Sequence, residues 1–301
     1  MNGEVVGPVE YFTLAGLRLK LGHIDDGVLV NKNAGSRYFF YEDDSCLACY
    51  DVFFRVLSVD QFPQGDVLLT GRPWDDIEMP YSWEILQLPQ GVGILVHFDG
   101  KCDIETALVS IDRKARQVTY YLHPAKLPVC FDLYENPLGV LLSIYLAHFH
   151  NGVVIHASGV DDKGKGYLFT GVSGIGKSTM ARIWGNGGAT VVNDDRLMLM
   201  PVTDGYNIAN TPMPYYTDVP KEAPLTAIFL LAQSKDNTLV PIKGAKAMAK
   251  VMANCMQHLH TRETVGHHLE IVQSIIEKVP VFELAFKPDA DVVRLVRGYL
   301  A

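Results

Sequence analysis

The sequence lacks the features that would connect it to a membrane or to nucleic acid. Its 301 residues carry a formal net charge of -8 and contain no long run of Lys and Arg, which disfavours a basic surface for nucleic acid or anionic lipid. The longest apolar run, residues 137–149, is too short to cross a bilayer and predicts a core helix. The first residues, MNGEVVGPVEYF, do not resemble a secretory signal. We therefore expect a cytoplasmic protein with no membrane or nucleic-acid partner.

Cysteine is scarce, and its spacing forms no disulfide framework. The count is odd, as expected for a protein of a reducing compartment. Cys46 and Cys49 form one CxxC pair, but no second pair and no βαβ pattern accompany it. Two ordinary thiols are therefore favoured over a redox or zinc site. The five cysteines are Cys46, Cys49, Cys102, Cys130 and Cys255.

Two domains are predicted from the change in pattern along the chain. Residues 1–133 contain short runs of period two, including the hairpin ALVSIDRKARQVTYYL at 107–122, and predict a small, largely antiparallel β-rich domain of unknown role. Residues 134–301 alternate strands with helices and predict an α/β domain. One helix is expected directly after the glycine loop described next. The other expected helices cover 137–149, 244–259, 264–277 and a last segment with Asp289 as N-cap.

The stretch GVSGIGKS at 171–178 matches the pattern GxxxxGK[ST] between a predicted strand and a predicted helix. In such a P-loop (Walker A motif) the glycines let successive backbone N–H groups turn toward the phosphates of a nucleotide. Lys177 would reach the β- and γ-phosphates, and Ser178 would ligate Mg²⁺. A glycine-rich turn that matches by chance is the alternative, and the flanking strand and helix disfavour it. The predicted nucleotide-binding residues are Gly171, Ser173, Gly174, Ile175, Gly176, Lys177, Ser178 and Thr179.

Three further polar residues are predicted to act beside this loop. Asp194 and Asp195 follow ATVV, expected to be a parallel strand whose C-terminal end lies at the ligand edge of the sheet. One of the two carboxylates would hold Mg²⁺, while the other would accept a proton from an attacking hydroxyl. Their alternative is a solvated turn. His156 lies on the strand GVVIHASG, and its alternative is an ordinary core histidine.

From His156 to Arg196 the sequence resembles the nucleotide-binding core of HPr kinase/phosphorylase and related serine kinases, a superfamily that includes the phosphoenolpyruvate carboxykinases. The resemblance rests on the order and spacing of a histidine, the loop SGIGKS and the run DDR. It implies a P-loop α/β domain of that type preceded by a smaller β-rich domain. It also implies that Asp195 is the proton acceptor, which leaves Asp194 to hold Mg²⁺. Lys177 corresponds to the P-loop lysine, Ser178 to a metal ligand and His156 to the histidine before the loop. Relatives of this kind tend to assemble as oligomers, so a homo-oligomer is one expectation for this chain.

The sequence departs from this family downstream. The expected metal-binding glutamate and the glycine pair before a catalytic arginine are replaced by NTPMPYYTDVPKEAPLTAIFLL. Asp218 or Glu222 could stand in for the glutamate. The positive charge could come from any of three arginines, Arg196, Arg262 and Arg294. The segment 212–220 could close over a substrate or merely connect two elements.

These observations predict a kinase that uses ATP and Mg²⁺. Asp195 would deprotonate the hydroxyl of a serine in a protein or peptide, or of a small molecule. Lys177, Mg²⁺ and His156 would stabilise charge on the transferred phosphoryl group. Three alternatives stay open: carboxykinase-like transfer, which needs several arginines; an NTPase that activates water; and a non-catalytic nucleotide-sensing module.

Histidines are concentrated near the C-terminal helices but lack the spacing of metal ligands. We therefore expect surface histidines on a helix–loop–helix. His148 and His150 end the apolar helix, where a cation favours the helix dipole. The helix–loop–helix set comprises Cys255, His258, His260, His267, His268 and Glu270.

Overall fold

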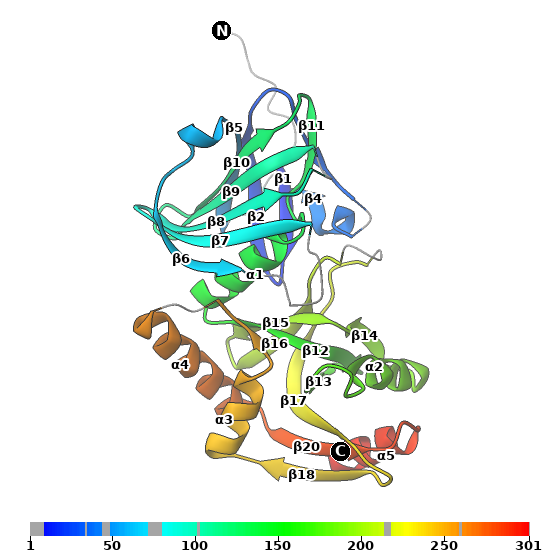
Figure 1. Cartoon of the computed structure of the whole chain (residues 1–301). Coiled ribbons are helices and arrows are strands. Elements are labelled where there is room, and N and C mark those ends of the chain that lie inside the picture. The colour runs from blue at the N-terminus through cyan, green and yellow to red at the C-terminus, as the bar shows by residue number, and fades with distance from the viewer. Residues whose placement is uncertain are drawn as a thin grey trace. The chain divides into compact units, whose positions relative to one another are not determined.

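The structure is a computed structural model that describes residues 9–33, 35–43, 49–71, 80–100, 103–213, 218–258 and 261–300. The fold is mixed α/β (Figure 1). Contacts divide the chain into unit 1, Met1–Leu142 with Pro212–Val219, and unit 2, Ser143–Thr211 with Pro220–Ala301. The boundary expected from the sequence precedes α1 (Leu138–Phe149), whereas the division by contacts falls inside this helix.

Unit 1 is built on a sheet that has nine strands within the described residues, in the order β4-β1-β2-β5-β10-β9-β8-β7-β6. Most neighbours are antiparallel, and β5 pairs in parallel with both β2 and β10. The period-two pattern explains the faces: Leu17, Leu19 and Leu21 are buried along β2, while Arg18 between them is exposed. The hairpin predicted at 107–122 is β9 with β10.

The elements of unit 1 precede α1. They are β1 (Glu10–Leu14), β2 (Leu17–Ile24), β3 (Val28–Asn31), η1 (Arg37–Phe39), β4 (Phe40–Glu42), β5 (Tyr50–Val56), η2 (Val59–Gln61), β6 (Asp66–Gly71), β7 (Tyr81–Leu88), β8 (Gly91–Phe98), β9 (Ile104–Asp112), β10 (Gln117–Pro124) and β11 (Val129–Asp132). Strands β3 and β11 form a separate parallel pair.

Unit 2 contains the remaining elements. They are β12 (Val153–Asp162), β13 (Lys165–Thr170), α2 (Lys177–Asn186), β14 (Thr190–Asn193), β15 (Arg196–Val202), β16 (Gly205–Asn210), β17 (Glu222–Gln233), β18 (Thr238–Ile242), α3 (Gly244–Met252), β19 (Cys255–Met256), α4 (Arg262–Lys278), β20 (Val281–Phe286) and α5 (Asp291–Tyr299). Strand β17 pairs in parallel with both β13 and β20, while β12, β15 and β16 are joined by antiparallel ladders.

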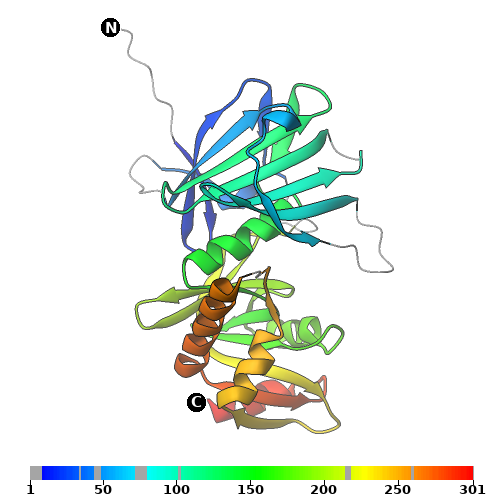
Figure 2. The ribbon, with the colours of Figure 1, turned by 60° about the vertical axis from the view of Figure 1, so that its left-hand side comes forward.

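Two hydrophobic cores lie against the sheet of unit 2. Buried residues of α3 and α4, including Ala247, Val251 and Ile275, share one core with β12, β15 and β16. Trp184 of α2 and Val296 of α5 belong to the second core. The ribbon shows α3 and α4 together, apart from α2 and α5 (Figures 1 and 2). Strand β13 contributes to both cores, with Leu168 in the first and Phe169 in the second, whereas α2 contributes to the second core.

Several sequence-based expectations are corrected by these elements. The helix expected over 244–259 ends at Met252, because Cys255 and Met256 instead pair with Ile155 and Val154 of β12. Asp289 does not cap α5, whose N-cap is Ala290; its carboxylate instead accepts hydrogen bonds near the start of the helix and from Asn237.

The structure bears on two further expectations, those for the cysteines and for a membrane-spanning helix. Cys49, Cys130 and Cys255 are free thiols, and burial raises the pKa of Cys255 to about 12. Cys46 and Cys102 lie outside the described residues, so the character of the CxxC pair stays a prediction. No helix in the described part of the chain has the length and apolarity needed to span a membrane.

Candidate phosphate-binding loop and catalytic residues

The glycine loop joins β13 directly to α2. Gly171, Gly174 and Gly176 have positive φ angles of 147°, 76° and 116°, a region that residues with a Cβ rarely adopt. Gly176 is the N-cap of α2, and no side chain caps that end of the helix. The backbone N–H groups and the positive end of the helix dipole therefore remain suited to an anion.

Neighbouring side chains restrict the loop differently at two of its glycines. A Cβ built on Gly176 would lie 2.7 Å from Cζ of Phe286, whereas one on Gly174 would meet nothing within 4 Å. Gly176 is therefore required by both its backbone angle and its surroundings. Gly174 is exposed, so its side of the loop remains open to a ligand.

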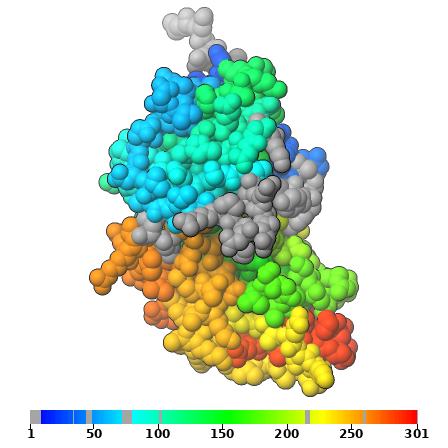
Figure 3. Space-filling view, viewed as in Figure 1, coloured from blue at the N-terminus to red at the C-terminus, as the bar shows by residue number. Residues whose placement is uncertain are grey.

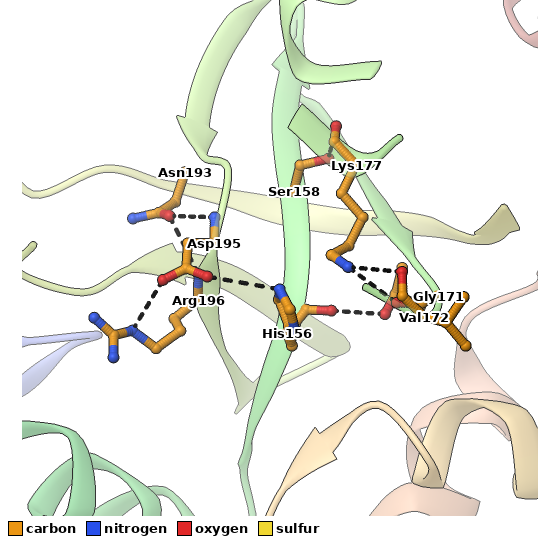
Figure 4. Close-up of polar contacts among 9 residues, drawn as sticks. His156, Ser158, Gly171, Val172, Lys177, Asn193, Asp195 and Arg196 are labelled. Carbon is orange, nitrogen blue, oxygen red and sulfur yellow. Dashed lines mark hydrogen bonds and ion pairs between the residues drawn. The ribbon is translucent and has the colours of Figure 1, made fainter. Parts of the chain in front are cut away.

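Lys177 lies across the loop with only 6% of its surface exposed. Its Nζ donates to the carbonyl oxygens of Gly171 at 3.0 Å and Val172 at 3.2 Å (Figure 4). Burial lowers the pKa of Lys177, while the negative charge of Asp195 acts in the opposite direction. An anion entering the loop could exchange these neutral acceptors for charged oxygens, a stronger hydrogen bond for an ammonium group.

His156 and Asp195 form a partly exposed pair beside the lysine. Nε2 of His156 lies 3.6 Å from Oδ1 of Asp195, and about two-fifths of each side chain is exposed (43% and 42%). The pKa of His156 is lowered, chiefly by burial and then by Lys177 and Arg196, although Asp195 raises it. The imidazole is therefore held toward its neutral form.

Asp194 and Asp195 occupy a turn between two strands that pair with β12. The expected parallel strand is wrong: β14 is antiparallel to β12, with Asn193 opposite Gly159, and β15 then pairs with Val153–His156. This arrangement brings the turn to His156, because the backbone N–H of Ala157 donates to the carbonyl oxygen of Asp195 at 3.0 Å. The turn that carries Asp194 and Asp195 is therefore positioned by two strands antiparallel to β12, and not by the parallel strand that the sequence predicted.

Asn193 is a positioning residue that the sequence reasoning missed. Its side chain is buried, with 2% of the residue exposed, and Oδ1 accepts hydrogen bonds from the backbone N–H groups of Asp195 at 2.8 Å and Arg196 at 3.3 Å. Asparagine commonly closes such turns through bonds to the backbone two residues on. An Asn directly before DD was the available sequence signal.

Ser158 and Thr170 were also missed. The buried hydroxyl of Ser158 donates to the carbonyl oxygen of Lys177 at 2.8 Å, and the hydroxyl of Thr170 donates to that of His156 at the same distance. Because alternate residues of a strand share a face, the spacing of His156 and Ser158 was the available signal. These two bonds connect β12 to the start of α2 and to the end of β13.

The remaining predicted loop and metal residues have different surroundings. Ser173 and Ser178 are exposed, Thr179 is half-buried, and Ile175 packs against the core beneath α2. Within the described residues, no three side chains among His, Cys, Asp and Glu gather to hold a metal ion. Binding of Mg²⁺ by Ser178 and Asp194 therefore stays a prediction.

Of the three arginines considered, the structure places Arg196 at the site, with Nε 3.4 Å from Oδ2 of Asp195. Arg294 instead forms an ion pair with Asp291, and Arg262 begins α4. Glu222 begins β17, where its residue partner is Ala209 of β16. Residues 214–217 lie outside the described residues, so closure of segment 212–220 stays a prediction.

The expectation of surface histidines is wrong for His268. It is 2% exposed, and its ring centroid lies 6.2 Å from that of His148, which is itself buried and lies 4.9 Å from the ring of His267. Burial lowers the pKa of His268, and the charge of His267 adds to the effect. The helical pattern did not reveal that α1 covers this side of α4.

Comparisons with known proteins add a family match and a distant structural likeness. The family model described as SynChlorMet cassette protein ScmC matches residues 138–287. No curated protein matches the chain. The Hpr(Ser) kinase/phosphatase from Coxiella burnetii is a solved structure with a TM-score of 0.30 and 13% sequence identity, covering 49% of this chain and 97% of that chain. At that TM-score the likeness does not define the fold, so the functional argument rests on the residues themselves.

Proposed function

We propose that unit 2 is a kinase of the HPr kinase-like type that transfers the γ-phosphoryl group of ATP to a hydroxyl group. The observation that carries the proposal is the juxtaposition of Lys177, at the end of an anion-compatible glycine loop, with the pair His156 and Asp195. Such a juxtaposition combines binding of phosphate with a base for the attacking group. The motif-level resemblance between His156 and Arg196 adds support.

The loop and α2 would hold the nucleotide. Backbone N–H groups of residues 171–178 and the N-terminus of α2 would bind phosphate oxygens, while Lys177 would exchange its bonds to Gly171 and Val172 for bonds to phosphate. Ser178 and Asp194 would hold Mg²⁺, which neutralises phosphate charge when bound. The P-loop assignment and both cofactors belong to this proposal.

Asp195 would act as the general base. Its backbone is held by Asn193 and Ala157, and its carboxylate lies beside His156 and Arg196. A fixed carboxylate can accept the hydroxyl proton as the oxygen attacks, so much of the acceleration would come from positioning. Neutral His156 would donate a hydrogen bond toward the developing negative charge, and Lys177 would contribute a full positive charge.

The acceptor would be a serine hydroxyl of a protein or peptide, or the hydroxyl of a small molecule. The chemical class of the acceptor distinguishes this proposal from the alternatives. Water as acceptor would make the protein an NTPase, and a carboxylic acid would make it carboxykinase-like. Nucleotide binding without turnover would make it a sensor.

The test is phosphoryl transfer from γ-labelled ATP with Mg²⁺, with and without a lysate as acceptor pool. It compares the wild type with Lys177→Met and Asp195→Asn; Lys235→Met and Asp204→Asn serve as matched controls at exposed turns. We expect one discrete labelled acceptor in the wild type and the controls and none in the two site variants. Release of phosphate independent of any acceptor would indicate an NTPase. Lys177-dependent binding of ATP without any turnover would overturn the catalytic proposal.

A further inference from the structure

A groove with a volume of about 720 Å³ opens in unit 2, away from every residue named in the candidate site. Its walls come from the end of β18, α3, the end of α4 and the start of β20. Helices α3 and α4 reach the molecular surface (Figure 3, amber and orange). The apolar lining includes Ile242, Ala245, Met248, Ile276 and Val281. The volume falls within the range of about 300–1,000 Å³ that is typical of small-molecule sites.

The rim of the groove has an excess of positive charge. Lys243 and Lys278 line it, and neither forms an ion pair with a described carboxylate. Nζ of Lys278 lies 5.7 Å from the ring centroid of Tyr206, an interaction that leaves its charge intact. The one acidic residue of the lining, Glu277, accepts a hydrogen bond from Gln273 at 2.8 Å. The rim is therefore complementary to a negatively charged group.

The first turn of α3 adds to this complementarity. It contains no acidic residue, and its N-cap Lys243 provides no side-chain hydrogen bond to the backbone. Gly244 and Ala245 of this turn belong to the lining. A negative group at the rim would thus meet two lysines and the positive end of the helix dipole together, while an attached apolar chain would cover Met248 and Ile276.

From this combination we propose that the groove is a binding site for a small amphipathic molecule with an apolar body and one carboxylate. The carboxylate lies at the rim near Lys243 and Lys278, and the apolar body lies between α3 and α4. Burial of the body supplies most of the affinity, and the lysines select the charge. The site is independent of the proposed kinase activity, because binding here needs neither ATP nor any residue of the glycine loop.

The first test compares octanoate, 1-octanol and octyltrimethylammonium by calorimetric titration of the full chain. These ligands share an apolar chain and differ in charge. We expect one octanoate per chain, bound about fivefold more tightly than octanol, with octyltrimethylammonium weakest. Added salt should reduce the preference for octanoate. Equal affinity for octanoate and octanol would overturn the assignment of a carboxylate.

Variants locate the site. Ala245→Trp should fill the groove and abolish binding of both octanoate and octanol, whereas Ala249→Trp on the same helix, outside the lining, should leave both unchanged. Lys243→Gln combined with Lys278→Gln should reduce the affinity for octanoate toward that for octanol and leave octanol unaffected. Octanoate binding that persists in folded Ala245→Trp would overturn the proposal. The lysine variant tests it independently if Ala245→Trp does not fold.

Discussion

The hydroxyl of Ser158 donates a hydrogen bond to the backbone carbonyl oxygen of Lys177, nineteen residues further along the chain. Ser158 is fully buried on β12, so the bond fixes the first turn of α2 against the strand that also carries His156. The relative position of the lysine and the histidine therefore depends on a residue whose hydrogen bond goes to the backbone of the lysine and not to its side chain.

Replacement of Ser158 by alanine should test this connection. We expect Ser158→Ala to reduce the free energy of unfolding by about 1 kcal/mol, the usual contribution of one hydrogen bond. The affinity for ATP should also fall, because the N-terminus of α2 loses an attachment. Urea unfolding and nucleotide titration measure the two effects. Ser110→Ala, in β9 of unit 1, should leave nucleotide affinity unchanged; an equal loss there would contradict the prediction.

Asn193→Ala should impair turnover more than binding. Two backbone N–H groups, those of Asp195 and Arg196, would lose their acceptor, and the proposed base would no longer be held in place. We expect kcat to fall about tenfold or more, since small displacements of catalytic groups are costly, with little change in the KM for ATP. Asn193→Asp keeps an acceptor oxygen and should recover part of the activity. A higher KM at unchanged kcat would exclude this role.

The pKa of His156 should respond with opposite sign to two substitutions. Lys177→Met removes a positive neighbour and should raise it; Asp195→Asn removes a negative neighbour and should lower it. Titration of the imidazole by NMR measures both shifts without any substrate, so the outcome does not depend on the proposed activity. Shifts of the same sign in both variants would show that the two charges do not act on His156 as described.

The two glycines of the loop should differ in their tolerance of alanine. Gly176→Ala places a Cβ against Phe286 at an unfavourable φ angle, whereas Gly174→Ala introduces backbone strain alone. Strain of that kind costs about 1–2 kcal/mol, and the clash adds to it at position 176. Urea unfolding should therefore rank Gly176→Ala as the less stable. Phe286→Leu should recover part of the loss in Gly176→Ala and none in Gly174→Ala.

The stability of the protein should decrease in mildly acidic solution, and His268 should contribute. Because burial lowers its pKa below the ordinary value of 6.5, the unfolded chain binds more protons than the folded chain below about that pH. The free energy of unfolding therefore falls as the pH decreases through 6.5 toward the folded pKa. His268→Leu should show a weaker decrease between pH 7 and 5. Identical pH profiles for the variant and the wild type would contradict this assignment.

Local pattern was sufficient to predict much of the secondary structure. A continuous apolar run indicated α1, apolar residues with helical spacing indicated α4, and the turn between two β-rich runs indicated the β9–β10 hairpin. The local sequence pattern gave a wrong prediction where pairing with a strand distant in sequence determined the secondary structure. Cys255 continues a helical stripe with Met248 and Met252 in the sequence, yet Cys255 and Met256 form a strand because they pair with β12. Likewise, the run ending at Asn193 predicts a strand but not its direction.

The side chains of the candidate site were easier to predict than their supports. Lys177 and Asp195 belong to motifs with a fixed spacing, and the structure brings them close enough to influence each other electrostatically. Ser158 and Asn193 act through hydrogen bonds to backbone atoms, and such bonds leave little trace in a motif. They require knowledge of which carbonyl or N–H group lies opposite.

One strand, β12, sets the spacing of the whole site. It pairs with β13, β14, β15 and β19, and each partner adjoins a different component: the glycine loop, the acidic turn, Arg196 and Asn254, whose carbonyl oxygen accepts from the N–H of His156. Sliding β12 by two residues would preserve which side chains point inward but displace His156 by about 7 Å. The distances between the residues of the site can therefore change only by whole register shifts of β12. Insertions during evolution or engineering should be tolerated in the turns around β12 rather than within it.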